Sequence, residues 1–97
     1  MTAYVYILCS RSRSRNALYT GSARDLRRRV EQHRANAVDA HTARYRIHRL
    51  VYFEMHDRLD EALLRERRVK RWHRAWKEDL INSVNPEWRD LSMEIPL

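Results

Sequence analysis

The chain has 97 residues, of which 43% are apolar and 34% are charged, with 20 Lys or Arg against 13 Asp or Glu. This length suits one modest hydrophobic core and is too short for two, and the apolar share excludes a disordered basic tail. The net charge of +7 indicates a polyanion or an anionic surface as the partner. We expect residues 1–97 to form a single domain.

Other sequence features bear on the cellular setting. No apolar run approaches the roughly 20 residues of a membrane-spanning helix, and the N-terminal residues show no signal-peptide pattern. The single cysteine, Cys9, lies in an apolar run and is expected in the core rather than as a nucleophile or in a disulfide. No CxxC or HExxH spacing marks a zinc site. These features favour a cytoplasmic protein with no membrane partner and no disulfide-linked partner.

Three strands are expected. Residues 4–9 (YVYILC) are β-branched and aromatic and predict a buried strand. The polar run SRSRSRN predicts a hairpin turn, with residues 18–20 as the returning strand. Gly21, the chain's only glycine, would let the backbone leave that strand where a side chain would clash. Residues 47–54 (IHRLVYFE) predict the third strand.

The first helix is expected after Gly21. Ser22 is predicted to cap it, with Asp25 in the first turn, where a negative charge suits the helix dipole. Its inward stripe is predicted from apolar and polar positions at helical spacing, namely Leu26, Val30, His33 and Ala37. Residues 36–46 are expected to form a polar connection to the third strand.

A long helical region is expected to open at residues 57–60. It would bend at residues 73–74 and end at 85–86, because the residue before proline disfavours the helical conformation. Both Trp72 and Trp76 fit its inward stripe, and the remaining tail is expected to pack through Trp88 and Leu91. The order β-β-α-β-α-α predicts an α+β fold, in which helices flank a small three-stranded antiparallel sheet.

Glu66 is a polar residue where a core residue is expected. It shares a helix face with Ala62, Leu63, Val69 and His73. An unpaired buried carboxylate is costly, so Glu66 would need an arginine, a lysine or a metal ion. The alternative is a Glu at the edge of the stripe that pairs with Lys70 at i+4.

Arg29 and His33 form a second candidate pair on the first helix. Arg29 lies about 60° from Leu26 and about 40° from His33 around the helix axis, so it can reach back toward Tyr6 and Tyr19. The alternatives are a solvated arginine whose stem covers apolar surface, and a hydrogen-bonded core histidine. Tyr6 and Tyr19 lie on strands expected to be neighbours, where packing alone is the alternative.

The run RERRVKRWHRAWK holds seven Lys or Arg, with Glu66 as its one acidic residue. A purely structural interpretation of this run is a solvated helix face with both tryptophans turned inward. The surplus of positive charge in the run, however, suits binding to a phosphate backbone. Together with two phenols, an arginine, a histidine and a carboxylate, this surface is typical of phosphodiester chemistry. A phenol can assist an attacking water, an arginine can stabilise phosphate charge, and a carboxylate can hold a divalent metal.

These residues resemble the GIY-YIG nuclease superfamily, and in particular its stand-alone bacterial type. The likeness rests on YVYIL, LYTG, DLxxRxxxH, LVYFE, ALxxE, KxW and NPxW in order along the chain. Departures include Tyr4 in place of the first signature's glycine, and Val5 and Thr20 in place of isoleucines. The connecting segments also lack glycines that relatives often carry.

The resemblance implies the fold stated above and a Mg²⁺-dependent or Mn²⁺-dependent DNA endonuclease. It implies that Glu66 holds the metal, that Arg29 binds the scissile phosphate, and that Tyr19 or Tyr6 activates water with His33 assisting. Arg29 and the metal would both lower the pKa of the phenolic base. It further implies a role in DNA repair or recombination. The rival hypothesis is a non-catalytic nucleic-acid-binding module, and a less favoured one is a protein-interaction surface at Trp72 and Trp76.

Seven basic residues are predicted to contact DNA: Arg24, Arg27, Arg28, Arg44, Arg46, Lys70 and Arg74.

Overall fold

The computed structural model describes residues 2–10, 17–35 and 47–96. Its single sheet has three antiparallel strands in the order β2-β1-β3: β1 (Ala3–Ser10), β2 (Leu18–Ala23) and β3 (Ile47–His56). Every residue of the central strand β1 is buried, because elements cover both faces of the sheet. This accounts for the continuous apolar run in the sequence, and the predicted fold class is confirmed.

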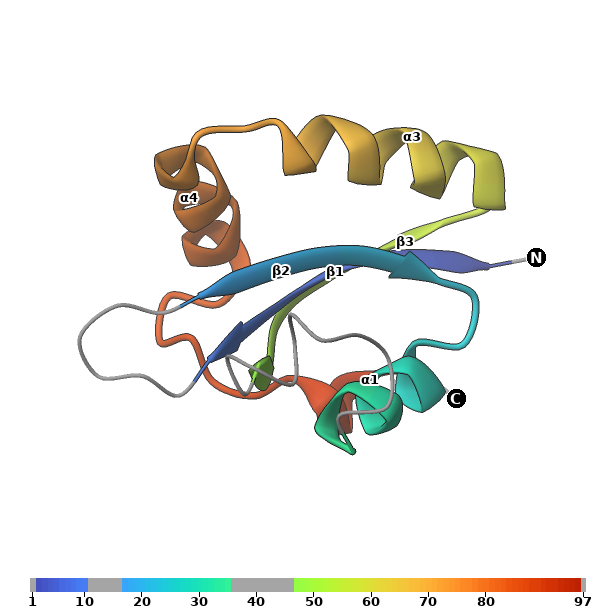
Figure 1. Ribbon diagram of the computed structural model, residues 1–97, viewed down its shortest axis with the longest axis horizontal. Helices are drawn as coiled ribbons and strands as arrows, with labels where there is room; N and C mark the ends of the chain where they lie inside the picture. Colours follow the sequence, from blue (N-terminus) through green and yellow to red (C-terminus); the bar gives the residue numbers. More distant parts are fainter. Residues whose placement is uncertain (1, 11–16, 36–46, 97) are drawn as a thin grey trace.

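The sheet lies between two layers (Figure 1). Helices α3 (Leu59–Lys70) and α4 (Arg74–Val84) cover one face. Helix α1 (Leu26–Arg34) and the C-terminal segment, with the 3-10 turn η1 (Ser92–Glu94), cover the other. Side chains alternate between the faces of β1, so Tyr4, Tyr6 and Leu8 pack toward α1 while Ile7 and Cys9 pack toward α3 and α4.

Two boundary predictions near Gly21 are wrong. Strand β2 continues through Gly21 to Ala23, and Gly21 pairs with Tyr6. Ser22 therefore lies within the strand and does not cap α1. The cap is Asp25, whose carboxylate accepts a hydrogen bond from the backbone N of Arg28 at 3.1 Å. The hydroxyl of Ser22 is instead engaged by a carboxylate from α3, which is described below.

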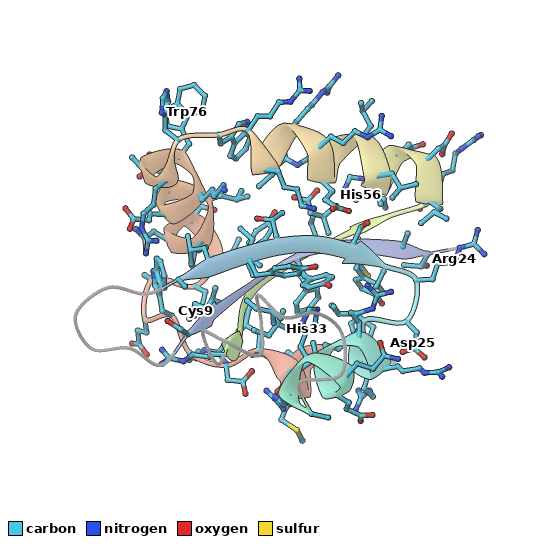
Figure 2. All side chains as sticks on the ribbon, viewed as in Figure 1. Cys9, Arg24, Asp25, His33, His56 and Trp76 are labelled. Carbon is cyan, nitrogen blue, oxygen red and sulfur yellow. The ribbon has the colours of Figure 1, made fainter. Side chains whose placement is uncertain are left out.

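The break between α3 and α4 falls at residues 71–73, beginning two residues before the predicted bend at 73–74, and it overturns one prediction about burial. Trp72 is half-buried against the core, whereas Trp76 is 55% exposed. The prediction assumed one helical period across both helices, but the helix axis changes direction at the break, so positions that share a face in the sequence pattern no longer share a face in the structure. Trp76 therefore points outward from the start of α4 (Figure 2).

The tail packs as expected. Leu91 is buried in the core on the α1 side, and Trp88 packs against the core on the α3 side. Asn85 fastens this segment, since its side-chain amide donates to the carbonyl oxygens of Val51 and Arg89 at 3.0 and 2.9 Å. Within the described parts of the chain, no helix is long and apolar enough to cross a bilayer. The prediction for Ala37 lies outside the described residues.

Candidate active site

Tyr6 and Tyr19 meet at Gly21 on the α1 face of the sheet. Tyr6 is fully buried and lies opposite Gly21 in the β1-β2 register, with Tyr19 two residues before Gly21 on β2. The two phenol rings are 6.4 Å apart, centroid to centroid. A Cβ at position 21 would lie 2.5 Å from Tyr6 Oη and 3.2 Å from Tyr19 Cε1. Gly21 does not adopt a positive φ, so it is the absence of a side chain that lets the phenols occupy this place.

His33 joins the two tyrosines from helix α1. Its Nε2 lies 3.1 Å from Tyr6 Oη, within a buried hydrogen bond. Its ring centroid is 4.9 Å from that of Tyr19 and 6.0 Å from that of Tyr6. His33 is fully buried together with Leu26 and Val30, as the helical spacing predicted, and it lies between the sheet and α1 in Figure 2.

Arg29 completes the cluster on this face. It is partly buried and hydrogen-bonds the Tyr6 phenol. Burial raises the pKa of Tyr6 well above its usual range, and the neighbouring Tyr19 and Glu66 act in the same direction. The charge and hydrogen bond of Arg29 lower that pKa, but by less than burial raises it. Arg29 therefore acts on the pKa of Tyr6 in the expected direction, but burial outweighs it, and Tyr6 stays protonated at neutral pH.

Glu66 approaches the cluster from the opposite face of the sheet. Its side chain is 17% exposed, and one carboxylate oxygen accepts a short hydrogen bond from the hydroxyl of Ser22. The other oxygen pairs with Lys70 Nζ at 2.6 Å. Because β2 is an edge strand and Ser22 follows Gly21 directly, the carboxylate lies beside the strand edge next to the phenols. Its charge acts on the Tyr6 phenol across that edge.

A second polar network fixes α3 against β3. The carboxylate of Glu54 accepts from Tyr52 Oη at 2.5 Å and from Arg65 Nε at 3.2 and 3.1 Å, and lies 2.5 Å from His56 Nε2. Burial raises the pKa of Glu54, but these hydrogen bonds and the Arg65 charge outweigh burial and leave it below its ordinary value. Since Arg65 precedes Glu66, this anchor sets the orientation from which Glu66 faces β2.

Arginines line a hollow next to the cluster. The hollow has a volume of about 420 Å³ and is lined by residues of β2, α1 and α3 and of the β2–α1 connection. Its lining comprises Ser22, Ala23, Arg24, Asp25, Arg28, Arg29, Gln32, Leu59 and Leu63. Three of these are arginines, so the hollow combines a concave shape with the positive charge that a phosphate backbone requires. Arg24 and Asp25 lie where β2 leads into α1 (Figure 2).

The remaining predicted DNA contacts lie in several places. The exposed Arg27 donates to the carbonyl oxygen of Ile95 at 3.0 Å, which ties α1 to the C-terminal segment. Arg74 pairs with Glu78 at 3.1 Å, and Lys70 is the partner of Glu66. Arg44 and Arg46 lie outside the described residues.

The donor set for a metal ion is sparse. Among the described residues, no group of three or more His, Cys, Asp or Glu side chains is placed to hold a metal. Mg²⁺ often binds through one or two carboxylates, with waters and substrate phosphates completing its shell. One partly exposed carboxylate beside an arginine-lined hollow fits that kind of site. In this structure Lys70 Nζ forms an ion pair with one oxygen of that carboxylate, Glu66.

Ser22 and Gly21 have roles that the sequence analysis missed. Gly21 was assigned to a change of backbone direction and Ser22 to a helix cap, whereas they supply the space for the phenols and the partner of Glu66. The alternation of side chains along a strand is the signal for this. If the predicted strand had been extended by three residues to Ala23, the alternation of its side chains would have placed Ser22 on the face covered by the helix that carries Glu66.

Comparison with known proteins agrees with this geometry. The profile of the GIY-YIG catalytic domain matches residues 2–79. The chain belongs to the GIY-YIG family. Membership identifies a nuclease-type domain whose substrate class is nucleic acid.

Sequence relatives and a solved structure extend the match. A UPF0213 protein of Staphylococcus saprophyticus is 38% identical over 79 residues, which cover 81% of this chain and 93% of that one. A UPF0213 protein of Staphylococcus aureus is 40% identical over 79 residues, covering 80% and 92%. The solution NMR structure of the UPF0213 protein BH0048 from Bacillus halodurans has a TM-score of 0.58 at 29% identity, covering 93% of each chain.

Proposed function

We propose that this protein is a metal-dependent DNA endonuclease that hydrolyses phosphodiester bonds through Tyr6, Tyr19, Arg29, His33 and Glu66. The observation that carries the proposal is the crowding of two phenols, an imidazole and a guanidinium at the chain's only glycine, with a carboxylate one residue along the same strand edge. Burying polar and charged groups is costly for a core that only packs, and a cluster of an arginine, a histidine and two tyrosines beside an arginine-lined hollow is typical of a functional site.

In the proposed reaction, a water oxygen attacks the phosphorus atom and the bond from phosphorus to the 3′ oxygen breaks. The leaving 3′ oxygen keeps the electron pair of that bond and takes a proton from solvent, so the products are a 5′-phosphate and a 3′-hydroxyl. Arg29 is suited to binding a non-bridging phosphate oxygen, because it lines the hollow while its guanidinium also contacts the cluster.

The two tyrosines have different proposed roles. The buried, protonated Tyr6 holds His33 through their hydrogen bond. Tyr19 is only partly buried and contacts the His33 ring, so we assign to Tyr19 the orientation of the attacking water and acceptance of its proton, with the buried His33 assisting through that ring contact. A divalent cation held by Glu66, Mg²⁺ or Mn²⁺, would supply Lewis-acid stabilisation of charge on the phosphate and the leaving oxygen.

Purified protein incubated with single-stranded, nicked, branched and duplex DNA and with Mg²⁺ or Mn²⁺ tests the proposal. Cleavage that requires metal and is lost in Arg29→Ala and Glu66→Gln supports it. Absence of cleavage on every substrate would overturn it. A preference for nicked or branched DNA would support a role in DNA repair or recombination.

The alternative is a non-catalytic nucleic-acid-binding module on the same fold. One observation favours it: the ammonium of Lys70 already takes the carboxylate oxygen that a metal would need. A binder would show affinity that falls steeply with salt and no metal-dependent products, so the same preparation distinguishes the two.

A further inference from the structure

Trp76 is a large aromatic side chain that the fold leaves on the surface. It is 55% exposed and projects away from the sheet at the start of α4 (Figure 2). Its ring is held in place on two sides. The ring centroid of Trp72 lies 6.2 Å away at an interplanar angle of 78°, and that of His73 lies 5.5 Å away at 86°. Both neighbours meet Trp76 edge to face, so they fix its orientation and do not stack flat upon it.

A hollow adjoins this ring. It has a volume of about 400 Å³ and is lined by Trp72, Trp76, Asp79, Leu80 and Ser83. The lining is mainly apolar, and Asp79 supplies its single carboxylate. Such a surface suits the flat face of an aromatic ring, because a planar ligand can cover the indole while its polar edge stays in water.

The segment around Trp76 carries a surplus of cations, since residues 65–79 hold seven Lys or Arg and three Asp or Glu, among them Asp79 of the hollow. Lys77 is half-buried, and its pKa is lowered by burial and by the nearby Arg74 and Lys70. No carboxylate in the described parts of the chain forms an ion pair with Lys77. Glu78 is taken by Arg74 and Glu66 by Lys70. A phosphate group would relieve this accumulation of cations.

These cations connect Trp76 with the proposed active site. Lys70 contacts Glu66 directly, Lys70 acts on Lys77, and Lys77 follows Trp76 in the chain. A nucleic acid strand whose phosphates follow Lys70 and Lys77 from the reaction centre would bring an unpaired base to the indole. Charge complementarity with a polyanion therefore favours a nucleic acid here over a protein partner.

We propose that Trp76 is a stacking platform for one unpaired base of the substrate strand, and that Lys77 binds a neighbouring phosphate. The inference rests on the proposed function, because it names a contact for that same substrate away from the bond that is cleaved. It predicts that the protein distinguishes strands with accessible bases from strands whose bases are paired or missing.

Fluorescence anisotropy in the presence of a chelator tests this with two labelled strands of equal length, poly(dT) and an abasic sugar-phosphate strand. Trp76→Ala should weaken binding of poly(dT) about tenfold, as expected for the loss of one base–aromatic stack, and leave binding of the abasic strand unchanged. Trp76→Phe should retain most of the affinity. Lys77→Gln should weaken binding of both strands and reduce the salt slope by about one.

Leu64→Ala is the matched control, because Leu64 is 49% exposed on α3 and should leave both affinities unchanged. Thermal unfolding of each variant verifies that it folds. If wild-type protein binds poly(dT) and Trp76→Ala binds it equally well, the stacking inference is overturned while the proposed function stands. An equal loss on both strands would also overturn it. If wild-type protein binds neither strand, the stacking inference is overturned, and the cleavage assay on nicked, branched and duplex DNA decides the proposed function separately.

Discussion

Replacing Gly21 with alanine tests the link between the single glycine and the paired phenols. The new Cβ would lie 2.5 Å from Tyr6 Oη and 2.7 Å from Tyr6 Cζ, about 0.9 and 0.7 Å inside ordinary van der Waals contact, which begins at 3.4 Å. The ring cannot yield easily, because Tyr6 is fully buried and its hydroxyl is held by His33 at 3.1 Å.

The expected magnitude follows from two opposing effects. Overpacking of a buried site costs about 1–3 kcal/mol, whereas replacing glycine in a strand gains about 0.5–1 kcal/mol from the lost flexibility of the unfolded chain. We expect Gly21→Ala to lower the free energy of unfolding by about 1–2 kcal/mol, measured by urea denaturation. Nuclease activity should fall more than tenfold, since displacement of Tyr6 moves His33 and Arg29 with it.

Making Gly21→Ala in a second variant background, Tyr6→Leu, separates the effect of the contact with the Tyr6 ring from a general effect of alanine on the strand. In Tyr6→Leu, the ring that the new Cβ meets is gone and a space is left beside position 21. Gly21→Ala should then be neutral or stabilising. An equal loss of stability in both backgrounds would refute the reasoning, as would a Gly21→Ala variant with full stability and activity.

The other predictions concern three polar groups. Glu54→Gln should cost about 2 kcal/mol at pH 7 by urea denaturation, since it leaves Arg65 and His56 without their carboxylate. Because the folded pKa of Glu54 is lowered, its contribution is present above its unfolded pKa and is lost as pH falls through the folded pKa. The difference from wild type should therefore shrink below about pH 4, and a constant difference down to pH 2 would contradict this. Lys70→Gln should strengthen Mn²⁺ binding to free protein up to about fivefold in electron paramagnetic resonance titrations, because a half-exposed ion pair is worth up to about 1 kcal/mol; unchanged or weaker binding would count against Glu66 as the ligand. Tyr19→Phe should reduce the rate constant for cleavage more than Tyr6→Phe, and the reverse order would contradict the roles assigned to the two phenols.

Much of the fold could be predicted because local chemistry and tertiary packing agree. The continuous apolar run of β1 corresponds to a central strand covered on both faces, and the spacing of Leu26, Val30 and His33 corresponds to the buried stripe of α1. The pair Asn85-Pro86 marked the end of α4, where the Asn85 side chain fastens the tail.

The features that were missed depend on the arrangement of elements in space. Trp76 keeps a helical period with Trp72 along the sequence, but α4 has its own axis, and only the angle at the break decides which face meets the core. Ser22 carries a cap-forming side chain, but its partner Glu66 is 44 residues away in sequence. No local pattern reveals that a carboxylate held by Ser22 at the edge of β2 acts electrostatically on a phenol on the other face of the sheet.

Burial also outweighs one electrostatic effect that the sequence predicted. The arginine next to Tyr6 was expected to lower the pKa of the phenol, and it does act in that direction. Full burial in the core outweighs it. Sequence identifies charged neighbours more readily than it identifies the degree of desolvation, so the sign of the shift depended on the structure.

The most direct measurement of the central claim is DNA cleavage with Mn²⁺ by wild type, Glu66→Gln and Arg29→Ala, with Glu61→Gln and Arg58→Ala as matched controls. Glu61 and Arg58 are exposed residues at the beginning of α3 and take no part in the cluster. We expect metal-dependent product from wild type and both controls, and a loss of more than a hundredfold in Glu66→Gln and Arg29→Ala. Cleavage that persists in either of those two variants, or that falls equally in the controls, would contradict the claim that these residues form one active site.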